Sequence, residues 1–153
     1  MMKGHFMIKS KQALAIVLDS VRTKGTENIN AISSLHRILA QDIYARCDVP
    51  AFANSAMDGY ALRCADVKNA SWKSPVILGV VDDVAAGYVS KKKLKNGQAI
   101  RIMTGASIPQ GADSVVMVEF TQKFKTEAGE FVKVFKTTGY KENIRAKAED
   151  VKR

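Results

Sequence analysis

Three short segments of this 153-residue chain combine residue types that suit phosphate and metal chemistry. The first, Asp48–Ala61, places small, polar and turn-forming residues between two apolar stretches and includes Ser55 and Asp58. Gly59 follows Asp58 directly and argues against a long helix, so we expect the carboxylate at a turn beside a strand, where an aspartate oxygen suits Mg²⁺. The alternative is that Ser55 and Asp58, in S-x-x-D spacing, only cap a short turn.

The second segment, Ile100–Asp113, is an apolar stretch that runs into Thr104 and Gly105. A hydroxyl and a glycine at the end of a strand can offer an O–H group and unobstructed backbone N–H groups to an oxyanion. A Thr-Gly pair in this place is also an ordinary turn. The residues alone leave both interpretations open.

The third segment, Asn143–Asp150, ends in the adjacent carboxylates of Glu149 and Asp150 after a basic stretch. Neighbouring residues of an extended segment point to opposite faces, so these two acids are poorly placed to chelate one ion together. A solvated surface stretch is the alternative to a metal or substrate site.

Several other kinds of site lack support in the sequence. His5 and His36 are the only histidines and have no spaced partners, which argues against a histidine metal site or a Ser-His-Asp triad. Cys47 and Cys64 are the only cysteines and form no C-x-x-C pair, so a disulfide framework or a thiolate metal site has little support. No Walker A or G-x-G-x-x-G pattern occurs.

The net charge of +9 is spread evenly along the chain. Residues 1–50, 51–100 and 101–153 each carry three more basic than acidic groups, which makes nucleic acid an unlikely partner and leaves polynucleotide binding as the weaker alternative. Diffuse positive charge suits an enzyme with anionic substrates equally well. No apolar run approaches the roughly 18 residues that span a bilayer, so we expect a cytoplasmic protein without a membrane partner.

Two kinds of element are expected to position these segments. Apolar residues at helical spacing from Ala13 to Val21 predict a helix over Ser10–Arg22, with Ser10 as its N-cap. Alternation around Ile29 and Ala31 predicts a short strand. After Cys47 the chain is expected to be β-rich, with a hairpin tip at Ala128-Gly129 and strands over Tyr60–Leu62, Val76–Val81, Ala99–Met103, Val115–Val118 and Phe131–Phe135.

We therefore expect three parts: a helical and strand arm at 1–46, a β-rich lobe at 47–141, and the start of the chain's return to the arm at 142–153. The last segment ends at Arg153 without an element that could bury it. This pattern favours a truncated chain, and the sequence does not distinguish a natural truncation from half of a split protein.

The order and the residue sequences of the three segments resemble those of the molybdopterin molybdenumtransferase family, which includes bacterial MoeA and the corresponding domain of gephyrin. The resemblance covers Ser10–Val151, about the first third of a usual member, and is carried by Arg37–Ile43, Asp48–Pro50, Asn54–Ala61, Arg101–Ala106, Pro109–Met117, Asn143–Arg145 and Glu149-Asp150. It implies an α+β fold in which an elongated arm with N-terminal helices carries an inserted, mostly β lobe. The chain would be truncated before the pterin-binding α/β domain.

The resemblance also implies an activity and its ligands. Family members insert molybdate into adenylylated molybdopterin and release AMP with the help of Mg²⁺, in a cleft between the β lobe of one subunit and the pterin domain of another. This implies a homodimer, a pterin-binding domain supplied in cis or in trans, and molybdopterin adenylyltransferase as a further candidate partner. The isolated chain would be inactive, and a non-catalytic module for dimerisation or assembly is the alternative.

Carried over residue by residue, the resemblance places catalytic groups at Asp58, Thr104 and Asp150. It places substrate-binding groups at Asn54, Ser55 and Gly105, and Mg²⁺ ligands at Asp58 and Asp150. The chain departs from the family pattern at three positions, because Ala53 stands where an aspartate is common and His36 and Ala148 stand where glycines are common.

Overall fold

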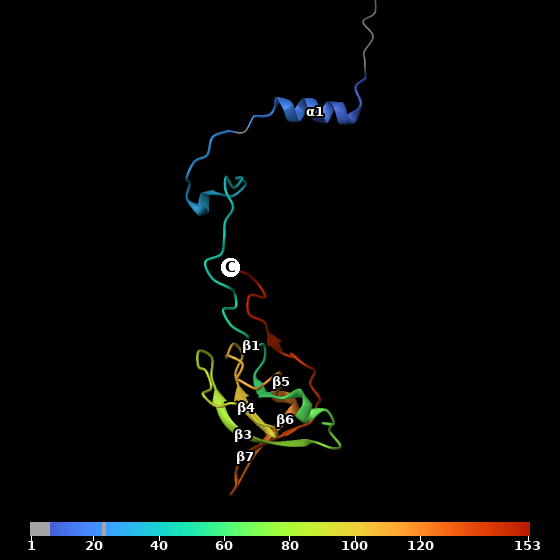
Figure 1. Cartoon of the computed structure of the whole chain (residues 1–153), viewed down its shortest axis with the longest axis vertical. Helices are drawn as coiled ribbons and strands as arrows, with labels where there is room; N and C mark the ends of the chain where they lie inside the picture. Colours follow the sequence, from blue (N-terminus) through green and yellow to red (C-terminus); the bar gives the residue numbers. More distant parts are fainter. Residues whose placement is uncertain (1–6, 23) are drawn as a thin grey trace, which may run out of the picture. The chain divides into compact units, whose positions relative to one another are not determined.

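The computed structural model describes residues 7–22 and 24–153, which divide into two compact units between Ile43 and Tyr44 (Figure 1). The N-terminal unit contains one α-helix, α1 (Ser10–Ser20), and a short 3₁₀ helix, η1 (Ala31–Ser33). The C-terminal unit holds the β-strands. The predicted α+β class is thus confirmed, whereas the predicted boundaries after residues 46 and 141 stay predictions.

The predicted helix forms, but its ends differ from the expectation. Lys9 is the N-cap, since its carbonyl accepts the first helical hydrogen bonds and its N–H is bonded by the Gln12 side chain, so Ser10 is already inside the helix. At the other end the Ser20 hydroxyl donates to the Val17 carbonyl at 2.7 Å, and the chain is extended from Val21. A serine that bonds the backbone locally competes with continuation of the helix.

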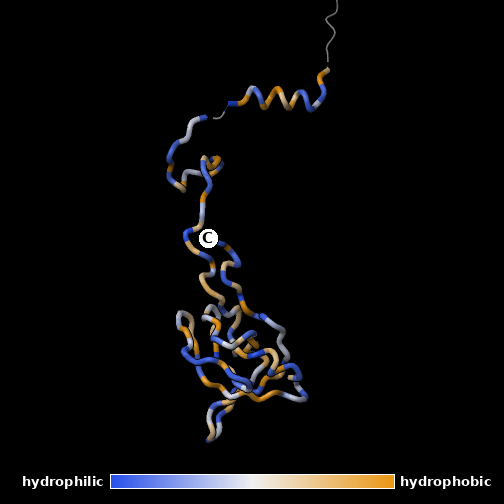
Figure 2. Tube along the Cα trace, in the orientation of Figure 1, coloured by the Kyte–Doolittle hydropathy of each residue, from blue (hydrophilic) through white to orange (hydrophobic). Residues whose placement is uncertain are grey.

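No residue of α1 is buried. Its apolar stripe is exposed to solvent, with side chains of Leu14, Val17 and Leu18 between 56% and 64% exposed. Figure 2 shows apolar and polar residues alternating along this helix. The stripe therefore has the pattern of a packing face without a partner inside its own unit.

The predicted strand at Ile29 and Ala31 is wrong. The Asn30 side chain accepts a hydrogen bond from the Ile32 N–H at 3.1 Å, and the backbone turns into η1 at Ala31. An asparagine that bonds the backbone two residues on offers the chain a turn in place of an extended ladder.

The C-terminal unit is built on a six-stranded sheet in the order β5-β2-β4-β3-β7-β6. The strands are β2 (Gly59–Leu62), β3 (Val76–Val84), β4 (Gln98–Ile102), β5 (Ser114–Met117), β6 (Thr121–Thr126) and β7 (Gly129–Val134). All neighbouring pairs are antiparallel except β3 and β4. The five predicted strands and the hairpin tip between β6 and β7 are confirmed. The short helix η2 (Cys64–Val67) connects β2 to β3, and η3 (Val118–Phe120) connects β5 to β6, the two edge strands of the sheet.

Two clusters of buried apolar side chains hold this sheet together. One gathers around Leu62, Leu78 and Val132, and the other around Ile100, Ile102 and Val115. Strand β4 contributes to both, because Ala99 belongs to the first cluster and Ile100 to the second. Successive side chains of β4 thus point to opposite faces of the sheet and are buried on both. The chain becomes exposed only beyond the end of β4, where it runs into Thr104.

A second, two-stranded sheet pairs β1 (Asn54–Ser55) with β8 (Ile144–Arg145). A bridge between Val49 and Val151 extends this pairing outward. The segment 142–153 therefore lies along the residues that precede β2, which brings the third polar segment to the Asp48–Ala61 stretch. The second polar segment reaches the same stretch through the bridge between Asn54 and Ser107 and the pairing of β2 with β4.

Candidate functional site

Asp58 lies at the turn between β1 and β2, directly before Gly59, where the structure has no room for a side chain. A Cβ at Gly59 would lie 1.9 Å from the Val116 carbonyl oxygen, so β2 can approach β5 this closely only with glycine. The Asp58 carbonyl accepts a 2.9 Å hydrogen bond from the Val118 N–H. The close pairing of β2 with β5 thus fixes the backbone of Asp58.

The carboxylate of Asp58 is bonded twice by one residue, Thr104. The Thr104 N–H and Oγ1 donate to Asp58 Oδ1 at 2.7 and 2.8 Å. These bonds lower the pKa of Asp58, first through the backbone N–H and then through the hydroxyl, and the charge of Arg101 adds to the effect. Both residues are exposed, so an ionised carboxylate is presented at the surface with one oxygen held in place.

The residues alone leave open both an oxyanion site and an ordinary turn after β4, and the structure shows that the N–H groups of this turn are engaged within the chain. The Thr104 N–H goes to Asp58, the Gly105 N–H donates to the Ser55 carbonyl at 2.8 Å, and the Ala106 N–H donates to the Met103 carbonyl. Gly105 has φ of 80°, a left-handed value that favours glycine. The turn fixes the Asp58 loop rather than presenting an open cradle of N–H groups.

Arg101 is a residue that the sequence interpretation did not assign to the site. Its Nη1 donates to the Gly59 carbonyl at 3.2 Å, and its guanidinium carbon lies 5.3 Å from the centre of the Tyr60 ring. It also lines a polar cavity of about 320 Å³ with Tyr60, Asp83 and Lys123 among its walls. The signal available in the sequence was an arginine interrupting the apolar run Ala99–Met103.

Ser55 and Asn54, the predicted substrate-binding residues of the loop, are both buried. The Ser55 hydroxyl donates to the Met57 carbonyl at 2.5 Å and accepts from the Met57 N–H at 3.3 Å. Asn54 Nδ2 donates to the Phe52 carbonyl at 3.5 Å. These contacts shape the loop, and the substrate-binding roles of Ser55, Asn54 and Gly105 stay predictions.

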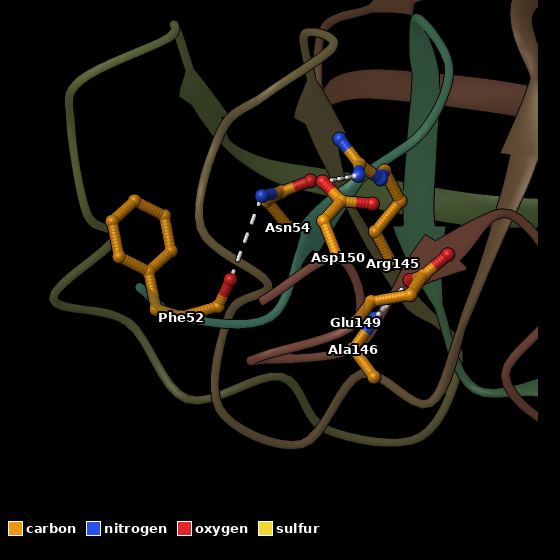
Figure 3. Close-up of polar contacts among 6 residues, drawn as sticks. All are labelled: Phe52, Asn54, Arg145, Ala146, Glu149 and Asp150. Carbon is orange, nitrogen blue, oxygen red and sulfur yellow. Dashed lines mark hydrogen bonds and ion pairs between the residues drawn. The ribbon is translucent and has the colours of Figure 1, made fainter. Parts of the chain in front are cut away.

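Asp150 forms a separate polar cluster with Arg145, beside Asn54 (Figure 3). Arg145 Nη2 donates to Asp150 Oδ2 at 2.5 Å, and this bond raises the pKa of Arg145. The neighbouring acid, Glu149, accepts instead from the Ala146 N–H at 2.8 Å. The two adjacent carboxylates therefore have different partners, although they lie in a bend and not in the expected extended segment.

The residue before this acidic pair is in a strained conformation. Ala148 has φ of 60°, which residues other than glycine rarely adopt, and its N–H donates to the Pro50 carbonyl at 2.9 Å. His36 has φ of 64°. Two of the positions where the chain departs from a glycine of the family pattern thus have backbone that favours glycine. Of the two histidines, His36 is exposed, and His5 lies outside the described residues.

The clusters of Asp58 and Asp150 are linked through the β1 strand. Gly105, next to Thr104, bonds the carbonyl of Ser55, and the adjacent Asn54 pairs with Arg145. Over residues 7–22 and 24–153, no hydrogen bond or ion pair joins the two carboxylates directly. The two predicted acids therefore lie in different loops that both contact β1.

The donor set was tested against Mg²⁺, which usually takes one or two carboxylates together with substrate phosphates and several waters. Within the described part of the chain, no group of three or more His, Cys, Asp or Glu side chains is arranged to hold a metal ion. Asp58 fits as a single carboxylate ligand, because both bonds from Thr104 fall on Oδ1 and leave Oδ2 for a metal. Asp150 is the weaker candidate ligand, because the guanidinium of Arg145 already pairs with its charge and would compete with a cation.

Comparison with known proteins identifies the family to which this fold belongs. A crystal structure of the molybdopterin biosynthesis moeA protein from Pyrococcus horikoshii OT3 matches 94% of the chain and 37% of that protein, with a TM-score of 0.80 and 35% identity. Residues 8–153 match the family model described as MoeA N-terminal region (domain I and II). The chain belongs to this MoeA family.

Curated relatives carry the name molybdopterin molybdenumtransferase. The protein of Bacillus subtilis (strain 168) is 45% identical over 128 residues, which are 84% of this chain and 30% of the relative. A Staphylococcus epidermidis protein is 40% identical over 145 residues, or 95% of this chain and 34% of the relative. The chain therefore spans about a third of the length of these relatives. Among the described residues, no helix is both long and apolar enough to cross a membrane.

Proposed function

We propose that this chain supplies one wall of a composite site that inserts molybdate into adenylylated molybdopterin and releases AMP. The names of the curated relatives support the molybdenum transfer. The family resemblance places the opposite wall in a pterin-binding domain, supplied in cis or in trans. The isolated chain is then inactive.

The observation that carries the proposal is the pair of hydrogen bonds from Thr104 to Asp58 Oδ1. They lower the pKa of the Asp58 carboxyl and fix the orientation of the carboxylate at an exposed turn. A fixed negative charge whose second oxygen is uncommitted suits a group that holds a cation against a phosphate. Thr104 positions this charge, and its own exposed hydroxyl lies next to it.

Mg²⁺ is the cation that the family resemblance implies, and Asp58 would hold it through Oδ2. When bound, Mg²⁺ supplies charge neutralisation for cleavage of a phosphoanhydride. Arg101, which already acts on the charge of Asp58, adds a fixed positive group beside the turn. Arg145 would compete with the cation for the charge of Asp150, so the catalytic role of Asp150 is the less supported of the two acids.

The test is reconstitution. The chain, a separately produced pterin-binding domain of a homologous molybdopterin molybdenumtransferase, and the two mixed together are incubated with adenylylated molybdopterin, molybdate and Mg²⁺. We expect AMP release only from the mixture. AMP release from the pterin-binding domain alone, at the rate of the mixture, would contradict a contribution of this chain to the site.

A second candidate function, a non-catalytic module for dimerisation or assembly, is favoured by the exposed apolar stripe of α1. Such a face usually buries itself against another chain. Sedimentation of the chain and of the Leu14→Glu/Leu18→Glu variant tests this candidate. A dimer that dissociates in the variant supports assembly through α1, and a strict monomer at high concentration contradicts it.

A further inference from the structure

We infer that Asn143 is a positioning residue that holds the Asp58 loop in its hydrogen-bonding geometry, an inference whose catalytic meaning rests on the proposed function. Asn143 lies two residues before Arg145, in the turn that precedes β8. Its two hydrogen bonds are to Val115 and Ala56, and neither involves Asp58 or Thr104. Its effect on the carboxylate would therefore pass through the backbone of the loop.

The turn around Asn143 forms hydrogen bonds along the edge of β5. The Lys141 N–H donates to the Asp113 carbonyl at 2.8 Å, and the Val115 N–H donates to the Glu142 carbonyl at 3.1 Å. The next bond of this ladder comes from a side chain, because Asn143 Nδ2 donates to the Val115 carbonyl at 2.9 Å. The asparagine amide thus takes the place of a backbone N–H where the chain turns away.

The turn itself requires a residue that tolerates left-handed backbone. Asn143 has φ of 58°, and asparagine enters this region more readily than other residues with a side chain. In this conformation the Asn143 carbonyl accepts a hydrogen bond from the Ala56 N–H at 2.9 Å. Asn143 therefore fastens the loop to β5 with its side chain on one side and its carbonyl on the other.

Ala56 lies between the two points where the turn after β4 bonds the loop. Before it, the Ser55 carbonyl accepts from the Gly105 N–H, and after it, Asp58 accepts from Thr104. The loop is thus held from one direction by Thr104-Gly105 and from another by Asn143. If the bond to Ala56 is lost, the loop keeps its contacts to the turn after β4 but loses the support that sets its position between them.

The test uses this chain and needs no substrate. Asn143→Gly keeps the left-handed backbone and removes the amide, and the pKa of the Asp58 carboxyl is followed by ¹³C NMR titration. We expect this pKa to rise toward its ordinary value and the Ala56 N–H to exchange with solvent roughly fivefold to tenfold faster, as for loss of about one net hydrogen bond. The matched control is Lys141→Gly, which changes a residue at φ of 61° in the same turn. The control should leave both quantities unchanged.

A residue with a merely structural role would lower the stability of the chain without moving the pKa of Asp58. An unchanged Asp58 pKa in folded Asn143→Gly therefore overturns the inference. If that variant does not fold, Asn143→Asp replaces the amide donor by a carboxylate of similar shape and is read by the exchange of the Ala56 N–H alone, because the added charge itself raises the Asp58 pKa. Unchanged Ala56 exchange in Asn143→Asp overturns the inference. In the unmodified chain, Ala56 exchange as fast as that of an exposed loop amide also overturns it. None of these readouts depends on AMP release, so a failure here is distinct from a failure of the proposed function.

Discussion

Asp58 and Thr104 are 46 positions apart in the sequence, yet Thr104 donates both its N–H and its hydroxyl to the same carboxylate oxygen of Asp58. The pairing of β2 with β4, in which Gly59 lies opposite Ile102, brings the two residues together just beyond the ends of their strands. The site is thus a product of strand register, and a change of register would separate its two members.

Thr104→Val tests how much each of the two hydrogen bonds from Thr104 lowers the pKa of Asp58. The substitution removes the hydroxyl donor but keeps the N–H, which is the larger cause of the lowered Asp58 pKa. We expect the Asp58 pKa in the variant to be higher than in the unmodified chain and still below its ordinary value. NMR titration measures this shift, and Thr126→Val in the β6–β7 hairpin is the control. An Asp58 pKa equal to that of the unmodified chain would show that the hydroxyl contributes nothing.

The lowered pKa of Asp58 also predicts a pH dependence of stability. Between the two pKa values of Asp58 the unfolded chain binds more protons than the folded chain, so the free energy of unfolding rises with pH there. The contribution of Asp58 is therefore present above its unfolded pKa and is lost as pH falls through its folded pKa. Urea unfolding at a series of acidic pH values should show a shallower loss of stability for Asp58→Asn. Parallel curves for the two proteins would contradict this linkage.

Ala148→Gly should stabilise the chain. The left-handed φ of Ala148 costs a residue with a Cβ roughly 1–2 kcal/mol, and the greater freedom of glycine in the unfolded chain offsets part of the gain. We expect a net increase of about 0.5–1 kcal/mol in the free energy of unfolding, measured with urea. Ala146→Gly, at a position without left-handed backbone, is the control and should lower stability slightly. Lower stability in Ala148→Gly than in this control would refute the strain at Ala148.

Gly59→Ala should be among the most damaging single substitutions in the sheet. The new Cβ would lie 1.9 Å from the Val116 carbonyl oxygen, so β2 and β5 must separate. We expect a loss of about 3 kcal/mol or more in the free energy of unfolding, in the range of severe packing defects. The control is Gly79→Ala in β3, whose Cβ would meet only ordinary contacts at 3.9 Å or beyond. Equal stability of the two variants would show that β2 does not approach β5 so closely.

Much of the β-rich unit follows from the sequence, because its strands are short apolar stretches with turn residues between them. The errors lie where a polar side chain bonds the local backbone: Asn30 turned an expected strand into η1, and Lys9 with Gln12 moved the helix cap away from Ser10. In such places periodicity is a weaker signal than one local hydrogen bond.

The candidate site was predictable in its residue types but not in its contacts. The sequence indicated Asp58 and Thr104 separately, and only the register of β2 and β4 makes them partners. That register also explains why the N–H groups of Thr104 and Gly105 donate to Asp58 and Ser55 of the same chain. The ion pair of Asp150 with Arg145 is local, since the two residues are five positions apart, but its place beside Asn54 depends on the return of the chain along β1.

The most direct test of the proposed role of Asp58 is the Asp58→Asn substitution in the reconstituted mixture of this chain with a pterin-binding domain. Mg²⁺-dependent AMP release from adenylylated molybdopterin is measured, with Asp19→Asn on α1 as the matched control. We predict a fall of roughly a hundredfold or more for Asp58→Asn, as for removal of one fixed electrostatic group from a site, and an unchanged rate for Asp19→Asn. An unchanged rate in folded Asp58→Asn would contradict the assignment of this carboxylate to the reaction.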